Sequence, residues 1–143
     1  MNTLRKLDTL LSEDSADDYW GDAGIDLGCE IAAMLSEDDW ENLREIWRLR
    51  SQKWQCRFAN LLDGVKAEYG VPILLTMLSS DDDRVVLSSI DSLDGIDDSL
   101  KKFVHCTESG ALVRLQKLQH RVGEDEALII QEISERIKAA GIR

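Results

Sequence analysis

The spacing of the apolar residues is the feature that most constrains the fold of this chain. Apolar side chains recur at every third or fourth position and not at every second, as at Leu4, Leu7 and Leu11. This period places them on one face of an α-helix. The 143 residues include a single proline, Pro72, so there is little to interrupt helices. The sequence therefore predicts an all-α fold.

Capping residues and glycines set the expected helix boundaries. Ser36, followed by three acidic residues, is typical of an N-cap and predicts a helix that begins near Glu37. This helix is expected to break near Ser51, to resume, and to stop at Gly64 in a left-handed C-cap. The segment Gly70-Val71-Pro72 predicts the start of another helix, because proline in the first turn loses no helical hydrogen bond.

Two segments of the chain resemble each other. Residues 53–64 and 84–95, offset by 31 positions, both begin with a basic residue and both end in Leu-Asp-Gly. Each follows another expected helix, so the repeated unit would be a helical hairpin; a chance match of two helix ends is the alternative. We expect one compact domain over residues 1–143, with about seven or eight helices and with hairpin repeats over residues 36–96.

Charge limits the classes of partner. The chain has 28 acidic and 17 basic residues, for a net charge of -11, which disfavours nucleic acids and anionic membranes and favours a basic partner. Residues 1–45 hold 13 of the acids, and residues 81–98 hold seven aspartates. If hairpins stack side by side, the acids of 13–26, 37–39 and 81–98 could share one edge. The alternative is a solvated acidic surface that maintains solubility.

The sequence predicts a soluble, cytoplasmic protein. The first residues lack the apolar region of a signal peptide, and no segment approaches the ~18 uninterrupted apolar residues of a membrane span. The three cysteines, Cys29, Cys56 and Cys106, are widely spaced and form no CxxC pair. We therefore expect free, buried thiols, with neither a disulfide framework nor a zinc site.

The three consecutive aspartates Asp81–Asp83 allow a metal site, a binding surface or a helix start. Adjacent residues that enter a helix point about 100° apart, and the spaced ligands of an EF-hand are missing here, so a metal site is disfavoured. Ser79, Ser80 or Asp81 can cap the helix, with the remaining acids near the positive end of its dipole. We expect capping, and this is compatible with a binding role.

Four tryptophans allow two interpretations. Trp40, Trp47 and Trp54 are spaced by seven residues, which is typical of a buried stripe on one helix. Trp20 and Trp40 are instead flanked by acids, in DDYWGD and EDDWEN, and aromatic residues ringed by charge are typical of interface hot spots. The first interpretation buries the tryptophans in the core, and the second leaves Trp20 and Trp40 partly exposed. Of the four, we favour Trp20 and Trp40 as partner contacts.

Signals for catalysis are weak. His105, Cys106 and His120 would have to converge in a pocket to form a hydrolase site, and no glycine elbow, phosphate loop or ExxH motif accompanies them. Histidines on the surface or at helix ends are the simpler interpretation. We expect no enzymatic activity, no catalytic residue, no bound metal and no cofactor.

Residues 38–96 resemble the short HEAT-like repeats of small acidic immunity proteins from bacterial toxin systems, including contact-dependent growth inhibition. The resemblance lies in W-Q-x-R-x-A-x-x-L from Trp54 to Leu62 and in P-x-L-L-x-M-L-x-S-D-D-D from Pro72 to Asp83, and it covers less than half of the chain. It implies a binding inhibitor that occupies the active site or substrate cleft of a cognate toxin, often a basic nuclease.

Charge and resemblance together define the candidate contacts with the toxin. We expect a free monomer whose acids and aromatics block the toxin by steric and electrostatic occlusion, without turnover. A HEAT-like adaptor or scaffold is the alternative, and it predicts weak salt dependence of binding. The candidate partner-binding residues are Asp17, Asp18, Trp20, Asp22, Asp38, Asp39, Trp40, Asp81, Asp82 and Asp83.

Overall fold

The computed structural model describes residues 2–13, 20–96 and 99–141, and all its regular elements there are helices, which confirms the predicted fold class. These ranges hold nine α-helices, against the predicted seven or eight. The helix that was not predicted is α8, whose five residues are too few to show a helical period. The helices are α1 (Thr3–Ser12), α3 (Ile25–Ala32), α4 (Glu37–Ile46), α5 (Gln52–Leu62), α6 (Ala67–Met77), α7 (Asp83–Asp94), α8 (Ser99–Phe103), α9 (Ala111–Gln119) and α10 (Glu124–Ala139). Shorter turns are π-helical η1 (Trp20–Gly24) and the 3-10 turns η2 (Trp47–Leu49) and η3 (Val104–Cys106).

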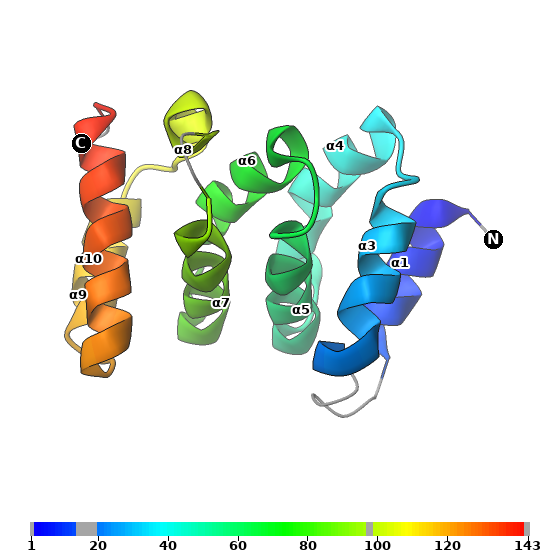
Figure 1. Ribbon diagram of the computed structural model, residues 1–143, viewed down its shortest axis with the longest axis horizontal. Helices are drawn as coiled ribbons and strands as arrows, with labels where there is room; N and C mark the ends of the chain where they lie inside the picture. Colours follow the sequence, from blue (N-terminus) through cyan, green and yellow to red (C-terminus); the bar gives the residue numbers. More distant parts are fainter. Residues whose placement is uncertain (1, 14–19, 97–98, 142–143) are drawn as a thin grey trace.

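The helices follow one another along the long axis, and the two termini lie at opposite ends (Figure 1). Consecutive helices reverse direction in four pairs: α1 packs on α3, α6 on α7 and α9 on α10, while α4 leads down the stack and α5 returns. The second members of these pairs form one row, in which α5 packs on α3 and α7, and α7 packs on α10. The two similar segments, 53–64 and 84–95, thus belong to adjacent helices of this row.

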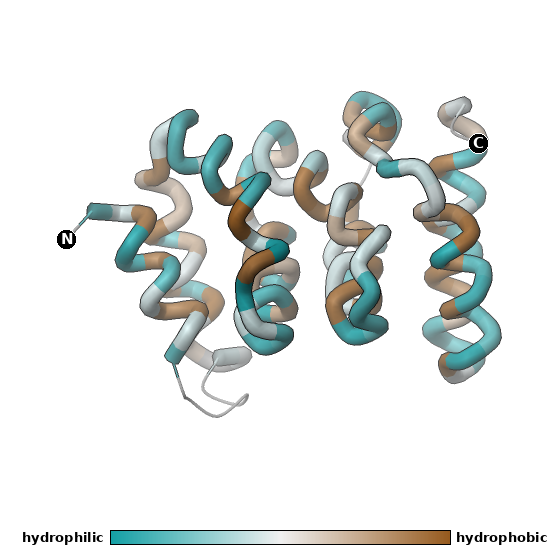
Figure 2. Tube along the Cα trace, turned by 180° about the vertical axis from the view of Figure 1, so that it is seen from behind, coloured by the Kyte–Doolittle hydropathy of each residue, from teal (hydrophilic) through white to brown (hydrophobic). Residues whose placement is uncertain are grey.

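One hydrophobic core extends through the stack, and Figure 2 shows hydrophobic positions recurring along the helices. The apolar segment Ile73–Leu78 of α6 and its end is buried almost throughout, as a helix that is apolar on every side should be. Phe58 of α5 is fully buried and contacts Trp54, with the ring centroids 4.9 Å apart. The central helices therefore carry much of the packing.

The predicted N-cap at Ser36 and the predicted break near Ser51 are confirmed. Ser36 caps α4 within a capping box, and Ser51 caps α5 after the 3-10 break. For α7 the capping residue is Asp82, not the predicted Ser79, Ser80 or Asp81. The left-handed C-cap expected at Gly64 is wrong, because among the described residues only Gly110 and Gly141 have positive φ.

The predicted start of a helix at Gly70-Val71-Pro72 is also wrong. Helix α6 begins one turn earlier, at Ala67, so Pro72 lies inside it. The proline removes one N–H donor near the helix start, where the affected carbonyl, that of the exposed Glu68, can be solvated. A proline can therefore lie beyond the first turn of a helix when the helix end is exposed to solvent.

A polar network ties α1 to the following hairpin. Asp8 Oδ1 accepts hydrogen bonds from the indole Nε1 of buried Trp54 at 2.9 Å and from Arg50 Nε at 2.9 Å. Asp8→Ala should lower the free energy of unfolding by about 1–3 kcal/mol, because the indole N–H would lose its acceptor. Denaturant unfolding measures the change. Asp8→Asn, which keeps an oxygen acceptor, should lose less, and equal losses would contradict the role given to the indole bond.

Candidate partner-binding site

A hollow of about 250 Å³ opens where α3, α4 and α6 meet. The connections at residues 33–36 and 63–66 lie beside it, at the upper edge of the stack in Figure 1. Three segments from different hairpins thus contribute to one cavity. We call it the upper hollow, and its lining residues are Cys29, Ala32, Ala33, Leu35, Trp40, Gly64, Val65, Lys66 and Tyr69.

An aromatic pair forms one wall of the upper hollow. Trp40 of α4 and Tyr69 of α6 stack with ring centroids 5.1 Å apart and an interplanar angle of 5°. Trp40 is only 3% exposed, whereas Tyr69 is half-buried, so the accessible aromatic surface belongs to Tyr69. The Tyr69 hydroxyl donates a hydrogen bond of 3.0 Å to Glu37. This bond fixes both the phenol ring and the carboxylate beside the cavity.

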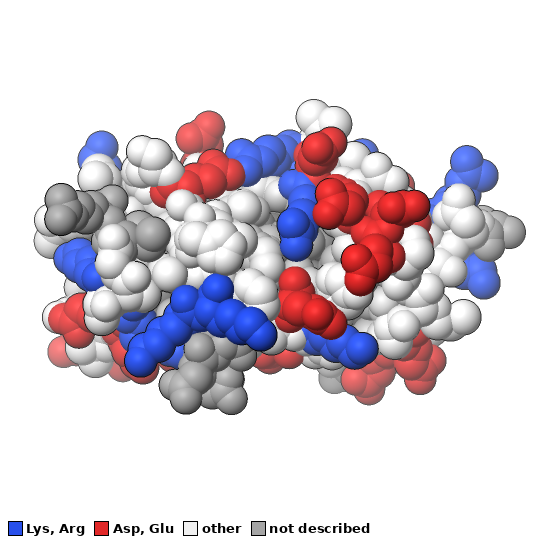
Figure 3. Space-filling view, turned by 90° about the horizontal axis from the view of Figure 1, so that it is seen from above, with Lys and Arg blue, Asp and Glu red and all other residues white. Residues whose placement is uncertain are grey.

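Carboxylates surround the aromatic wall. The hydrogen bond to Glu37 raises the pKa of Tyr69, and partial burial and the charges of Glu37 and Glu68 raise it further. Both glutamates are exposed. Seen from above, Asp and Glu side chains gather over the region of the α3–α4 connection and the start of α4 (Figure 3). The tyrosine therefore remains a neutral phenol in a negative potential.

Cys29 lies on the α3 side of the upper hollow. Its pKa is raised by burial first and then by the charges of Asp26 and Asp63, both exposed. The thiol is free and half-buried, and its Sγ lies 3.9 Å from the Leu61 carbonyl. A thiol held in its protonated form is a poor nucleophile. Cys29 is therefore not activated as a nucleophile in this cavity.

The predicted acids at the start of α4 have different surroundings. Asp39 belongs to the capping box, in which its carboxylate accepts from the Ser36 backbone N–H at 3.0 Å. Asp38 is exposed on the first turn. Asp17 and Asp18 lie outside the described residues, and for Asp22 only the backbone in η1 is described. Of the acids in this group, Asp38 is thus available at the surface near the upper hollow.

The predicted exposure of two tryptophans is wrong. Trp20 and Trp40 are 5% and 3% exposed, and Trp47 and Trp54 are buried as well. In α4 the helical period turns the Trp40 indole inward while Asp38 and Glu41 are exposed, so acids beside this tryptophan in sequence do not surround its ring in space. Trp40 still lines the upper hollow, as part of its wall.

Two of the three consecutive aspartates serve the structure itself. Asp83 binds Arg114 at 2.5 Å and Arg121 at 3.3 Å. Asp82 caps α7 and also accepts from the Gln52 side-chain amide at 2.7 Å. Asp81 is exposed. A second cavity, of about 370 Å³, includes Asp81 and Asp82 and is further lined by Trp47, Arg48, Gln55, Ser79 and Ser80.

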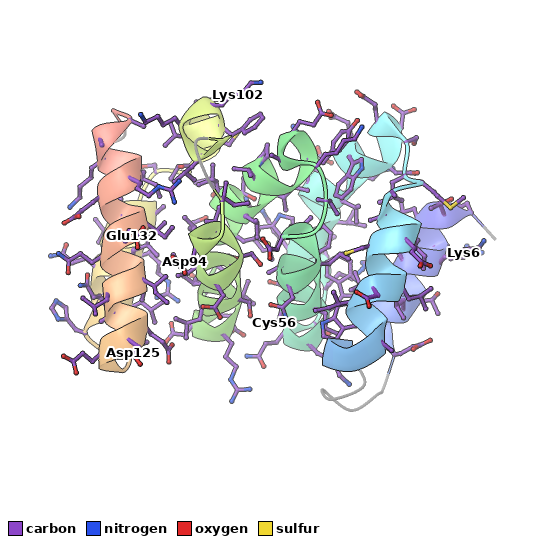
Figure 4. The ribbon with its side chains drawn as sticks, viewed as in Figure 1. Lys6, Cys56, Asp94, Lys102, Asp125 and Glu132 are labelled. Atoms are coloured by element: carbon purple, nitrogen blue, oxygen red, sulfur yellow. The ribbon has the colours of Figure 1, made fainter. Side chains whose placement is uncertain are left out.

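Among the described acids, those at the start of α4 and those at the start of α7 do not share the expected single edge. In Figure 1, α4 begins at the upper edge and α7 at the lower edge, because α4 is the first helix of its pair and α7 the second. Further along α7, Asp91 lies near Asp94 and Glu126, whose charges raise its pKa after burial. Figure 4 places Asp94 on α7 and Glu132 on the neighbouring α10. Asp81–Asp83, at the start of α7, therefore lie away from the acids of 37–39, and Asp97 and Asp98 lie outside the described residues.

The ion pairs of Asp83 predict a pH-dependent stability. The hydrogen bond from Arg114, followed by the charges of Arg114 and Arg121, lowers the pKa of Asp83 below its usual 3.8. The stabilisation is therefore complete above about pH 4 and is lost as the pH falls through the lower, folded pKa. Asp83→Asn should lower Tm at neutral pH by an amount that shrinks in acid. Asp81→Asn is the control, and an equal effect of both would contradict the prediction.

The residues considered for catalysis do not share a described cavity. His105 in η3 and His120 at the end of α9 are both exposed. Neither they nor Cys106 line the hollows described here or those at residues 112–138 and 20–91. Within residues 2–13, 20–96 and 99–141, no group of three or more His, Cys, Asp or Glu side chains could hold a metal ion.

Fold and cavity together define a helical stack with an acid-rimmed aromatic hollow. No family model, no curated protein and no solved structure matches this chain. In the parts of the chain that the structure describes, no helix is both long and apolar enough to cross a membrane. The function must therefore be argued from the upper hollow itself.

Sequence reasoning missed the residues that complete the upper hollow. Tyr69, Lys66 and Glu68 lie in the KAEYG segment, which was assigned to a connection before the helix. The only local signal was an aromatic residue beside charges. The meeting of this segment with α3 and α4 is a tertiary contact, for which no motif exists in the chain.

Proposed function

We propose that this chain is a binding protein that neutralises a basic protein toxin by covering the toxin's active site or substrate cleft with its acidic upper edge. The observation that carries the proposal is the upper hollow, whose wall is a stacked Trp40–Tyr69 pair with the exposed carboxylates of Glu37 and Glu68 next to the tyrosine. A cavity of negative potential favours a cationic surface. The toxin character of the partner rests on the resemblance of residues 38–96 to immunity proteins.

The physical basis of inhibition is complementarity. A nuclease presents a cationic groove to phosphates, and a rigid helical surface with clustered carboxylates can occupy the same groove. Opposite potentials speed association, and partly buried aromatic groups slow dissociation. In this mechanism the chain blocks access and performs no chemistry of its own.

A matched pair of double variants tests the proposal. Glu37→Gln with Glu68→Gln removes two charges beside the upper hollow, and Asp125→Asn with Glu132→Gln removes two from α10, at the far end of the stack (Figure 4). The tagged protein is used to capture partners from the source bacterium at low and high salt. We expect the wild-type chain to capture one basic polypeptide. High salt and the first double variant should reduce this capture, whereas the second double variant should not.

The captured protein is then expressed alone and together with the chain. Growth arrest that the wild-type chain relieves, and the first double variant relieves less, would support toxin neutralisation. Surface charges are screened beyond about 8 Å at physiological ionic strength, so salt should weaken the complex. Salt-insensitive capture of harmless assemblies, equal for both variants, would overturn the proposal in favour of a scaffold role.

A further inference from the structure

We propose that the upper hollow binds one arginine side chain of the basic partner. This assignment rests on the proposed function for its source, a protein, but it concerns a more specific property of the site. It identifies the chemical group that enters the cavity and the residues that receive it. The geometry that carries it is the position of Tyr69 and Lys66 in the lining of the hollow, with Glu37 held next to the opening by its hydrogen bond to the Tyr69 hydroxyl.

The shape and lining of the cavity fit a flat cation at the end of an aliphatic chain. The lining combines apolar side chains from the end of α3 with a half-buried phenol ring. Apolar walls suit the methylene stem, and an aromatic face attracts a cation above it. With Trp40 stacked on one side of Tyr69, the ring is held in a fixed orientation.

The carboxylates supply the electrostatic part of recognition. Glu37 already accepts one hydrogen bond from the Tyr69 hydroxyl, and a carboxylate has further acceptor sites for an incoming donor. A planar guanidinium can stack on an aromatic ring and donate to a carboxylate at the same time, which a compact ammonium cannot do equally well. This favours arginine over lysine as the occupant. An anionic group would be repelled by Glu37, Glu68, Asp26 and Asp63.

The chain supplies its own cation at the same opening. Lys66 lines the upper hollow and is exposed. An entering arginine would meet the positive charge of this side chain and would have to displace it. The assignment therefore predicts opposite effects for two neutralising substitutions on the same cavity: Glu37→Gln should weaken binding of an arginine probe, and Lys66→Gln should strengthen it.

The experiment uses a small probe, so that it does not depend on knowing the partner. The blocked tripeptide Gly-Arg-Gly is titrated into the full chain, and amide chemical shifts are followed by NMR. Saturable shifts are expected at the residues that line the upper hollow. The same peptide with citrulline, a neutral isostere, should bind about tenfold more weakly, since it loses the charge-assisted bonds.

Variants of unchanged fold make the test specific. We expect Glu37→Gln to weaken the arginine peptide about threefold and Lys66→Gln to strengthen it by a similar factor. Lys102→Gln, on α8 away from the cavity (Figure 4), removes the same charge as Lys66→Gln and should change nothing. The assignment would be overturned if no saturable shifts occurred at the hollow, or if the two lysine variants had equal effects. It would also be overturned if a peptide with citrulline or lysine in place of arginine bound equally well.

Failure of the assignment can be told apart from failure of the proposed function. If capture of a basic toxin depends on Glu37 and Glu68 but the arginine peptide does not bind the hollow, the function stands and the assignment is wrong. If the peptide binds as predicted but no toxin is captured, the cavity is an arginine site and toxin neutralisation is wrong.

Discussion

Replacing Phe58 with alanine should lower the free energy of unfolding by about 3–5 kcal/mol. Phe58 is fully buried in α5, the helix between α3 and α7, and its ring packs on Trp54. The surrounding helices belong to three different pairs, so they can close only part of the space left by the ring. A loss of this size is a large fraction of the about 5–15 kcal/mol that stabilises a typical domain.

Urea unfolding measures this loss as a lower midpoint with little change in the slope. Leu49→Ala is the matched control, because Leu49 is another large apolar residue nearby in the chain but is 78% exposed. Its effect should stay within about 0.5 kcal/mol. A Phe58→Ala protein as stable as the Leu49→Ala protein would show that α5 does not pack at the centre of the stack.

Replacing Gly70 with alanine should also destabilise the protein, by about 1–3 kcal/mol. A Cβ atom at this position would lie 2.6 Å from the Leu62 carbonyl oxygen and 2.9 Å from Val65 Cγ2. The first of these contacts is with backbone, so α6 would have to move away from the end of α5. This cost exceeds the roughly 1 kcal/mol that alanine gains over glycine inside a helix.

The Gly70→Ala substitution tests the upper hollow as well as stability, because Tyr69 is the preceding residue. A shift of α6 should change the stacking of Tyr69 on Trp40, and near-UV circular dichroism reports on these aromatic rings. Gly21→Ala is the control, since a Cβ atom at Gly21 has no neighbour within 4 Å. If both substitutions leave stability and the aromatic signal unchanged, the close contact between α5 and α6 is wrong.

Local chemistry in the sequence was sufficient to predict many of the helices. The N-cap at Ser36 is predictable because a hydroxyl before a helical pattern satisfies free amides within the same few residues. The buried character of Ile73–Leu78 followed from the absence of a polar face. Both are short-range properties, so neither depends on knowing the neighbours.

Local chemistry left open the partners of Asp83 and the exposure of Trp40, and only the tertiary structure determined them. Nothing near Asp83 in sequence indicates that Arg114 and Arg121 would pair with it, since they are 31 and 38 positions away. Trp40 was placed at the surface because its sequence neighbours are acidic, but α4 turns the indole towards Tyr69. In both cases the partner that determines the role lies on another hairpin.

The sequence by itself thus determined that this protein is a set of amphipathic helices with an excess of negative charge. Periodicity and caps act within a few residues, and net charge requires no structure at all. The packing of α3, α4 and α6 decided that Cys29, Trp40, Lys66 and Tyr69 surround one cavity, with Glu37 bonded to the tyrosine. That arrangement depends on the order and direction of the stacked helices, which place residues far apart in sequence at the same edge.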